Sequence, residues 1–197
     1  MKSATSAPSK KMLQFIVEAG MLKQVRRSGW SVIGMKHAES VADHSFRCAV
    51  IGYCLAHSEG IDPYRVLLMT LFNDIQEARI TDLHKMAQRY IESETFEDSS
   101  FAEQIQSLPK SLRDELTDSR AEWRRQKTRA SIVARDADIL ECLIQAKEYY
   151  EQGILQAAKF MKKAPRFLRT GSARRLWRLA RTQSLNEWWF NLTEFKR

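Results

Sequence analysis

The segment from Tyr64 to about Ala78 constrains the fold most strongly, because it is apolar on almost every side of a helix. Asp62 and Pro63 directly before it combine a capping side chain with a proline at the first helical position, which predicts a helix start. A helix that is apolar all round belongs at the centre of a helical bundle. We therefore expect the rest of the chain to pack around this helix. Its apolar side chains are Val66, Leu67, Leu68, Met69, Leu71, Phe72 and Ile75.

The segments before it have the amphipathic pattern of helices that surround such a centre. Lys10 to Arg27 follows a 3.6-residue apolar period and predicts a helix with one buried face. Ser40, with Asp43 three positions later, predicts the start of a second helix, which ends at Gly60. Only 7 Gly and 4 Pro leave little material for the turns of an all-β fold. The predicted fold class is therefore all-α, a bundle of roughly six to nine helices.

The second half of the chain continues as helices with irregular connections. Thr81 is expected to cap the helix that follows it, and residues 92–100, which are acidic and contain serines, are expected to form a mobile connection. The pair Ala164-Pro165 is expected to break the chain before two short final helices. Helices are predicted from Asp82 to about Ile91, from Ser111 onward, from Ala121 to Tyr150, from Ser172 to Arg181 and from Asn186 to about Leu192.

The two ends of the chain differ from its middle. Residues 1–9 are expected to be a disordered lead-in to a single domain over residues 10–197. From about residue 159 this domain continues as a basic C-terminal helical extension, with eleven Lys or Arg against only Glu187 and Glu194. A solvated helix face is the favoured interpretation, while contact with nucleic-acid phosphates remains open. The residues expected to carry such a contact are Arg174, Arg175 and Arg178.

No part of the chain indicates a membrane or an oxidising compartment. It has no apolar run of about 18 residues, and no apolar signal-peptide stretch follows the basic N-terminus. Cys48, Cys54 and Cys142 are an odd number of cysteines without metal-site or redox spacing. Cys48 and Cys54 lie in an apolar stretch and are expected to be buried free thiols. These features predict a cytoplasmic protein with no membrane contact.

Three separated places put metal-binding or ionisable side chains into apolar helical surroundings. His44 lies on the second helix and Asp138 within the long one, while Asp74 and Glu77 are expected on one face of the central helix. Burying carboxylates costs several kcal/mol each unless a cation or a donor compensates. Imidazole with two carboxylates is a ligand set that divalent first-row metals accept. From spacing alone, however, an ordinary packed residue is the more common interpretation of His44.

Four ordered segments between about residues 12 and 150 carry the clearest motifs. They are Arg27-Ser-Gly-Trp30, Glu39-Ser-Val-Ala-Asp-His44-Ser, Asn73-Asp74-Ile-Gln-Glu77-Ala-Arg-Ile-Thr-Asp82 and Arg135-Asp-Ala-Asp138. Together they resemble the HD-domain metal-dependent phosphohydrolase superfamily, in its small 5′-deoxynucleotidase-like branch. The ending Asn186-Glu-Trp-Trp189 is similar to the family's C-terminus. The resemblance implies an HD-domain helical bundle that often assembles as a homodimer.

The resemblance also implies a reaction. It is hydrolysis of a (deoxy)nucleoside 5′-monophosphate, or of a related small phosphate ester, by a metal-activated water. The implied cofactor is a divalent ion such as manganese, cobalt or magnesium. The implied metal ligands are His44, Asp74 and Asp138.

The remaining matching side chains would act on water, proton and nucleotide. Glu77 is implied to position or deprotonate the attacking water, and Asp82 to handle a proton near the leaving group. Arg27 and Trp30 are implied to hold the nucleotide, by phosphate contact and by packing on its sugar or base.

Asn73 stands where the family has the histidine of its His-Asp pair. An amide oxygen is a weaker ligand than imidazole for transition metals, although hard cations such as magnesium accept it. Three outcomes stay open. The protein holds a metal more weakly, prefers a harder cation, or has lost hydrolysis and become a nucleotide-binding or regulatory protein.

Three other positions near the motifs need an interpretation. Thr81 stands where the family has a glycine before Asp82, and we expect its capping ability to make the change tolerable. His84 has no spacing that places its ring at the metal, so we expect it at the surface or behind the ligands. We expect the same of Asp136, because the family pattern points to Asp138.

Overall fold

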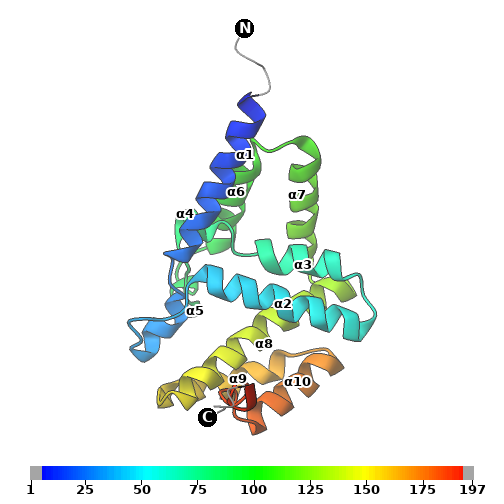
Figure 1. Cartoon of the computed structure of the whole chain (residues 1–197). Helices are drawn as coiled ribbons and strands as arrows, with labels where there is room; N and C mark the ends of the chain where they lie inside the picture. Colours follow the sequence, from blue (N-terminus) through cyan, green and yellow to red (C-terminus); the bar gives the residue numbers. More distant parts are fainter. Residues whose placement is uncertain (1–5, 193–197) are drawn as a thin grey trace, which may run out of the picture.

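Helices form nearly all of the regular structure in the part of the chain that the structure describes, residues 6–192. Over these residues the computed structural model has ten α-helices, five 3-10 helices and one isolated antiparallel bridge, between Arg26 and Ser40 (Figure 1). The all-α prediction is confirmed, and the single-turn helices α4 and α5 bring the number to ten. The α-helices are α1 (Ser6–Ala19), α2 (Val41–Glu59), α3 (Pro63–Phe72), α4 (Glu77–Ile80), α5 (Lys85–Gln88), α6 (Ser93–Ile105), α7 (Lys110–Arg125), α8 (Arg129–Glu151), α9 (Ala158–Lys163) and α10 (Gly171–Thr182). The 3-10 helices are η1 (Gly20–Lys23), η2 (Ser28–Ile33), η3 (Leu155–Ala157), η4 (Ala164–Phe167) and η5 (Phe190–Leu192).

Helix α3 packs most extensively against α2 and α8, and these three helices build the main hydrophobic core. Val66 and Met69 on α3 and Leu140 on α8 are fully buried in it. Gly52 allows α2 to approach α3 closely, because a Cβ at this position would lie 2.9 Å from Cγ2 of Thr70. The central place predicted for the apolar segment is therefore confirmed for α3.

The central helix ends at Phe72, earlier than predicted. The amide of Ile75 then donates to the carbonyl of Phe72 at 3.4 Å, and the amide of Glu77 donates to the carbonyl of Asp74 at 3.0 Å. Helix α4 starts only at Glu77. The expectation that Asp74 and Glu77 lie on one continuous helix face was therefore wrong. The tight turn between the two helices nevertheless keeps both carboxylates within electrostatic reach of each other.

Helices α1, α6 and α7 form a second layer that contacts the turn after α3 (Figure 1). Phe15 and Ala19 of α1 pack against the hydrophobic cluster around Ile75. The predicted buried face is confirmed at Phe15 and Ala19, but the helix ends at Ala19 instead of Arg27 and also has an exposed apolar side. Helix α1 begins at Ser6 instead of Lys10, and residues 1–5 of the predicted lead-in lie outside the described residues. The exposed apolar side chains of α1 are Met12, Leu13, Ile16 and Val17.

The stretch 92–100 was predicted to be a mobile connection, and this was wrong. Most of it belongs to α6. Glu97 of this helix pairs with Arg124 of α7 at 2.5 Å, and Asp98 pairs with Arg120 at 2.8 Å. The acidic residues that suggested a solvated linker are thus bound by arginines of the neighbouring helix.

The long helix predicted from Ala121 to Tyr150 is in fact two helices. Helix α7 ends where Gln126 adopts a left-handed backbone with φ of 49°. The hydroxyl of Thr128 accepts a hydrogen bond from the amide of Ser131 and the Ser131 hydroxyl accepts from the amide of Thr128, which forms a capping box. A capping box starts a new helix, so α8 changes direction from α7.

Thr81 does not cap the following helix, contrary to expectation. It ends α4 with φ of 63° and ψ of 167°, a backbone conformation that is populated almost only by glycine. Helix α5 is capped instead by His84, whose Nδ1 accepts a hydrogen bond from the amide of Ala87 at 3.0 Å. His84 therefore has a local structural role, and Thr81 holds a strained backbone where the resemblance expects glycine.

Helices α9 and α10 lie against α8, at the end of the molecule away from the N-terminus (Figure 1). Asp136 of α8 is buried and accepts hydrogen bonds from the amides of Arg169 at 2.9 Å and Thr170 at 2.6 Å. The hydroxyl of Thr170 donates to the same carboxylate at 2.6 Å. Asp136 therefore fixes the segment that leads into α10.

Other expectations have mixed outcomes. The helix predicted from Ser172 is α10, whereas only a 3-10 turn, Phe190–Leu192, forms where a helix was predicted from Asn186. Cys48 is buried as expected, but Cys54 is exposed. No helix among the described residues has the length and apolarity needed to cross a membrane.

Candidate metal centre and active site

His44 lies in the first turns of α2 and is buried between α2 and α8. The capping box of Ser40 and Asp43 fixes the start of this helix. Nε2 of His44 lies 3.2 Å from Oδ1 of Asp138 on α8 and 3.7 Å from Oδ2 of Asp74 in the turn after α3. The three side chains implied as metal ligands thus meet at one point, although they come from separate parts of the sequence.

The other ring nitrogen of His44 is held by Glu141, a residue that the sequence did not single out. Nδ1 of His44 donates to Oε2 of the fully buried Glu141 at 2.5 Å. Arg47 binds Oε1 of Glu141 through Nε at 3.0 Å and Nη2 at 2.9 Å, and its Nη1 reaches both carboxylate oxygens of Glu148 at 2.8 Å. This network fixes the ring so that Nε2 faces Asp74 and Asp138.

Helical spacing is the sequence signal that would have found this network. Arg47 follows His44 by three positions on α2, and Glu141 follows Asp138 by three positions on α8. Each pair therefore lies on one helix face, and α2 and α8 pack against each other.

Glu39, His44 and Glu141 form a second group whose ligand atoms lie within 4.8 Å of one another. Both oxygens of Glu141 already accept hydrogen bonds, and Oε1 of Glu39 accepts one from Nε1 of Trp30 at 2.9 Å. Burial, together with the charge of Glu141, raises the pKa of Glu39 to about 7. The Nε2 side of His44 is therefore the better position for a metal ion.

Arg27 places a guanidinium among the carboxylates of the site. Its Nη1 lies 3.5 Å from Oδ2 of Asp74 and 3.9 Å from Oδ1 of Asp82. Asp82 also accepts a hydrogen bond from the amide of Ser28 at 2.5 Å, which fixes the start of η2. The side chain of Arg27 is 20% exposed, so a ligand entering from solvent can reach it.

Glu77 begins α4 and carries an unsatisfied group beside this cluster. Its Oε2 is buried and has no hydrogen-bond partner among the described residues, and the same is true of Oγ of Ser28. Burial, together with the charges of Asp74 and Asp82, raises the pKa of Glu77 well above its ordinary value. Buried polar atoms without partners are rare in folded proteins, so these two indicate a place for a ligand or water.

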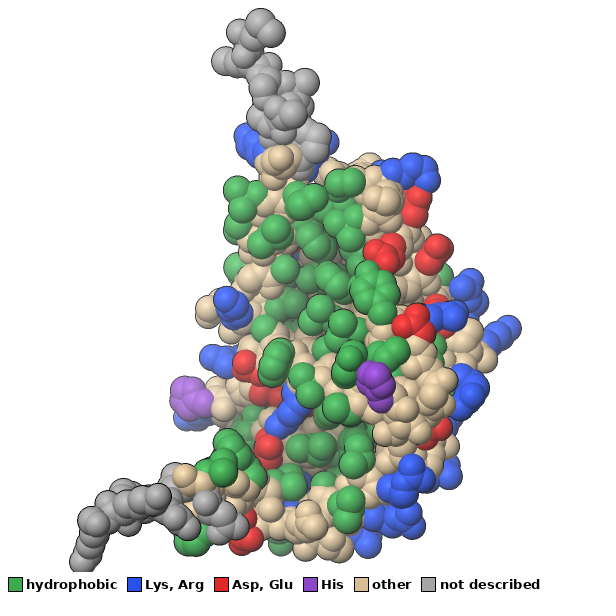
Figure 2. Space-filling view, turned by 45° about the vertical axis from the view of Figure 1, so that its right-hand side comes forward, with side chains coloured by type: hydrophobic (Ala, Val, Ile, Leu, Met, Phe, Trp, Pro, Cys, Tyr) green, Lys and Arg blue, Asp and Glu red, His purple; other side chains and the backbone are tan. Residues whose placement is uncertain are grey.

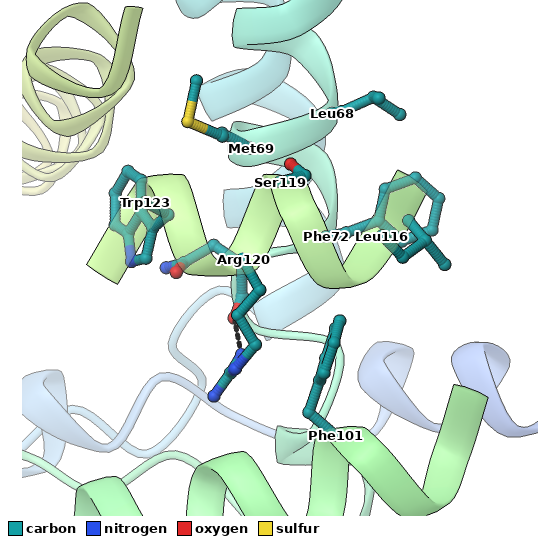
Figure 3. A pocket seen from close by; sticks show the side chains of 9 residues that line it. Leu68, Met69, Phe72, Phe101, Leu116, Ser119, Arg120 and Trp123 are labelled. Atoms are coloured by element: carbon teal, nitrogen blue, oxygen red, sulfur yellow. Dashed lines mark hydrogen bonds between the residues drawn. The ribbon is translucent and has the colours of Figure 1, made fainter. Parts of the chain in front are cut away.

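Asn73 orients its neighbour in the turn. Its Nδ2 donates to Oδ1 of Asp74 at 2.6 Å, while Nη1 of Arg120 donates to the carbonyl of Asn73 at 3.4 Å (Figure 3). Nη1 of Arg120 also donates to Oε1 of Gln76 at 3.0 Å. Arg120 therefore supports the turn from α7, and no sequence motif indicated this contact. The guanidinium stacks over the ring of Phe101, with 4.5 Å between its central carbon and the ring centroid.

A small cavity of about 10 Å³ lies beside Arg120, between α3, α6 and α7 (Figure 3). Such a volume is at the lower limit for one water molecule. The cavity is therefore too small for a nucleotide. It is lined by Leu68, Met69, Phe72, Asn73, Phe101, Leu116, Ser119, Arg120 and Trp123.

Comparison with known proteins agrees with this geometry. The model of the HD domain family matches residues 19–177. The chain belongs to the HD-domain family.

Individual relatives share both sequence and fold. The 5′-deoxynucleotidase HDDC2 of Dictyostelium discoideum is 30% identical over 149 residues, which cover 71% of this chain and 78% of that protein. A solved structure of a conserved hypothetical protein from Pyrococcus furiosus is 30% identical, with a TM-score of 0.70, and the match covers 87% of this chain and 99% of that chain. A predicted metal-dependent phosphohydrolase from Magnetospirillum magnetotacticum MS-1 shares the fold, with a TM-score of 0.69 at 23% identity over 90% of this chain and 93% of that one.

The residues of this site fit a divalent metal ion. An imidazole nitrogen and two carboxylates converge, which is a donor set for divalent first-row metals. Burial and Arg27 lower the pKa of His44, but Glu141 and Asp138 outweigh them and raise it to about 10. Burial raises the pKa of Asp138, but the hydrogen bond with His44 and the charge of Arg135 hold it below its usual range. The carboxylates thus favour positive charge at the point where the ligands meet.

Trp30 occupies a different position from the other motif residues of this HD domain. Its ring is only 3% exposed and packs against Tyr149 and Phe160, with ring centroids 5.1 Å and 4.6 Å away. Through its hydrogen bond to Glu39 it ties η2 to the segment before α2. The contacts observed are therefore internal, and packing of Trp30 on a nucleotide stays a prediction.

Proposed function

We propose that this HD-domain protein is a metal-dependent 5′-nucleotidase that hydrolyses (deoxy)nucleoside monophosphates. The observation that carries the proposal is the buried, unpartnered carboxylate oxygen of Glu77 beside the cluster of His44, Asp74 and Asp138. A carboxylate in this position is suited to take a proton from an attacking water. The activity named for the relative from Dictyostelium, 5′-deoxynucleotidase, supports the same reaction.

His44, Asp74 and Asp138 would hold the metal ion. When bound, the ion supplies positive charge that stabilises the negative charge developing on the phosphoryl oxygens. The ligand set suits manganese and cobalt, and the amide of Asn73 makes the site more acceptable to magnesium than a histidine would. Glu141 and Arg47 keep the imidazole in the orientation that this role requires.

Glu77 and Asp82 are assigned to proton transfer. Burial beside Asp74 and Asp82 raises the pKa of Glu77, which makes its carboxylate a stronger base toward water. The amide of Ser28 holds one oxygen of Asp82, and Arg27 lies near the other. We assign Asp82 to the proton that the leaving 5′-oxygen receives.

Arg27 is assigned to the substrate phosphate. A guanidinium binds phosphate through directed hydrogen bonds, and this one is partly exposed beside Asp74 and Asp82. Trp30 is assigned to the nucleoside side of the site, where its hydrogen bond to Glu39 supports η2.

The alternative function is that of a nucleotide-binding or regulatory protein without turnover, and Asn73 is the residue that suggests it. We favour hydrolysis, because Asn73 still orients Asp74 by a hydrogen bond and Arg120 still supports the turn. Glu77, which has no hydrogen-bond partner at Oε2 in the described part of the chain, would have no function in a protein that only binds.

We also propose that the protein forms a homodimer through the exposed apolar side of α1. One side of this helix packs on the core through Phe15 and Ala19, while Leu13, Ile16 and Val17 are 59–66% exposed on the other. Hydrophobic side chains cover much of the molecular face below the N-terminal trace (Figure 2). An exposed apolar area of this kind usually marks an interface, and the family resemblance implies a second copy as its occupant.

We place the protein in the cytoplasm. All three cysteines, Cys48, Cys54 and Cys142, are free thiols, which agrees with a reducing compartment.

Phosphate release from purified protein tests the proposed activity. The protein is stripped of metal, reloaded with manganese, cobalt or magnesium, and offered a deoxynucleoside 5′-monophosphate beside its 3′-isomer. The proposal predicts release that requires the ion and favours the 5′-isomer. Binding of the nucleotide without release under any of the three ions would support the alternative function.

A further inference from the structure

The segment from Gln152 to Asn186 contains nine Lys or Arg and no Asp or Glu. It forms η3, α9, η4 and α10, which pack on α8. All nine cationic side chains are exposed, and the active site described above uses none of them. They are Lys159, Lys162, Lys163, Arg166, Arg169, Arg174, Arg175, Arg178 and Arg181.

These cations are not neutralised by salt bridges. None of the nine pairs with a carboxylate within residues 6–192. Asp136 beside the segment is buried and accepts backbone hydrogen bonds. Glu59 accepts a hydrogen bond from the amide of Ser172 at 3.0 Å. Hydrogen bonds from Ser172 lower the pKa of Glu59, and the positive charge of Arg175 lowers it further. Apart from this partial compensation of Arg175, the positive charge of these side chains is available to bind a negatively charged partner.

Part of this charge lines a groove of about 360 Å³ between η4 and α10. Its apolar lining is provided by Pro165 and by the buried side chains Leu168 and Trp177. Three arginines from two successive turns of α10 complete it. They are Arg174, Arg175 and Arg178.

One of these arginines is held by a hydrogen bond, and a second lies close to the backbone of Gly171. Nε of Arg174 donates to the carbonyl of Leu168 at 2.9 Å, and no other hydrogen bond of its side chain occurs among the described residues. Nη1 of Arg175 passes Gly171 so closely that a Cβ there would lie 3.3 Å from it. Glycine at this position therefore leaves room for the guanidinium. The arginines are positioned at the groove, with donors left for a ligand.

We propose that this groove binds the phosphate backbone of single-stranded nucleic acid. Guanidinium groups bind phosphate oxygens through directed hydrogen bonds. Nine cations without a salt-bridge partner in the described part of the chain exceed what a single mononucleotide can neutralise, whereas a polynucleotide presents a phosphate at every residue. Phe167 directly precedes the groove residue Leu168 in the sequence and is 54% exposed, with the guanidinium of Arg166 4.7 Å from its ring centroid. An exposed aromatic ring beside a basic groove is a surface on which bases stack.

Fluorescence anisotropy of a labelled thymidine oligonucleotide of about 12 residues tests the proposal. The oligonucleotide lacks terminal phosphates, so that it is not a substrate analogue of the 5′-nucleotidase site. Full-length protein is compared with a variant carrying Arg174→Gln, Arg175→Gln and Arg178→Gln. The matched control removes three exposed charges elsewhere, by Lys36→Gln, Arg89→Gln and Arg125→Gln.

The expected result is binding whose affinity falls steeply with salt. The groove variant is expected to bind at least about tenfold more weakly, with a log–log salt slope smaller by about 2, since each phosphate contact contributes about 0.7 for single strands. The control variant keeps most of the affinity. Protection of residues 165–178 from hydrogen exchange by the oligonucleotide gives a second readout on the unaltered protein.

Three results would overturn the proposal. One is no binding at about 50 mM salt, and another is equal weakening in the groove and control variants. The third is displacement of the oligonucleotide by a nucleoside triphosphate at equal molar concentration, which would make the groove a site for small phosphates. Binding to anionic phospholipid vesicles without binding to the oligonucleotide would likewise contradict it.

Discussion

The buried carboxylate of Glu141 accepts a hydrogen bond of 2.5 Å from Nδ1 of His44, and both side chains are almost inaccessible to solvent. This contact decides which ring nitrogen faces the carboxylates of Asp74 and Asp138. Arg47 supplies the opposite charge that allows Glu141 to remain ionised, since His44 and Arg47 hold the pKa of Glu141 low against the effect of burial. The proposed metal centre is therefore supported by contacts among His44, Glu141 and Arg47, which link α2 and α8.

Glu141→Gln is expected to weaken metal binding. The amide keeps the volume of the side chain but removes the charge that orients the imidazole, and loss of such a supporting carboxylate costs about 10–100-fold in metal affinity. Calorimetric titration with manganese measures the change. Glu148→Gln is the matched control, because Glu148 contacts Arg47 without touching His44. Equal affinities of Glu141→Gln and the unaltered protein would contradict the assigned orientation.

Thr81→Gly is expected to stabilise the fold by about 1 kcal/mol. Thr81 holds φ of 63° and ψ of 167°, which strains any residue with a β-carbon by about 1–3 kcal/mol. Glycine removes this strain, but it also makes the unfolded chain more flexible, which offsets part of the gain in stability. Urea unfolding measures the free energy of unfolding. Thr81→Ala keeps the β-carbon and is expected to give no such gain. A destabilised Thr81→Gly variant would show that the backbone here is not strained.

The ion pair between Glu18 and Arg79 is expected to contribute stability at neutral pH and to lose it in acid. Nη2 of Arg79 lies 3.0 Å from Oε2 of Glu18, and hydrogen bonds from Arg79 and Gln104 lower the pKa of Glu18. Because the pKa of Glu18 is lower in the folded than in the unfolded protein, the pair stabilises the fold at pH values above the unfolded pKa of 4.5. This stabilisation is lost as the pH falls through the folded pKa.

Comparing Glu18→Gln with the unaltered protein measures this contribution. The difference in free energy of unfolding is expected to be below about 1 kcal/mol at neutral pH, because the pair is partly solvated, and to vanish in strong acid. Glu103→Gln is the control, since Glu103 is more exposed than Glu18 and contacts Arg79 only through Nη1. A difference that grows on acidification would have the wrong sign for this account.

The exposed apolar side of α1 is expected to hold two copies of the chain together. Ile16→Glu combined with Val17→Glu places two charges on that side and should shift the protein to a monomer in sedimentation velocity experiments. Leu176→Glu with Leu179→Glu, on the exposed side of α10, is the matched control and should leave the assembly unchanged. A monomeric unaltered protein would contradict the proposed dimer.

Local signals predicted the elements whose boundaries depend on neighbouring residues. The capping box at Ser40 and the Asp62-Pro63 start lie where expected, because capping uses side chains within three positions of each other. The early end of α3 was not predictable in this way. The residue that follows the helix, Asn73, accepts a hydrogen bond at its carbonyl from Arg120 of α7, which lies far away in the sequence. The acidic start of α6 was misinterpreted for the same reason, because its arginine partners lie on α7.

The candidate site shows the same division. A motif resemblance pointed to His44, Asp74 and Asp138, and the fold brings a carboxylate oxygen of each aspartate within 3.7 Å of Nε2 of His44. Glu141 and Arg47 lay outside the motifs, and their importance arises only when α2 packs on α8. Thr81 was expected to be harmless because threonine can cap a helix, but its backbone angles are set by the turn that positions Asp82.

The proposed function depends on Glu77 acting on water beside a bound metal ion, and a comparison of Glu77→Gln with the unaltered protein tests this most directly. Phosphate release from a deoxynucleoside 5′-monophosphate and metal affinity are measured on both, with Asn73→His beside them. The account predicts turnover by the unaltered protein, and a kcat about 10²–10⁴-fold lower for Glu77→Gln with metal binding retained. No turnover by the unaltered protein with any divalent ion, together with activity gained by Asn73→His, would contradict it and leave a nucleotide-binding protein in its place.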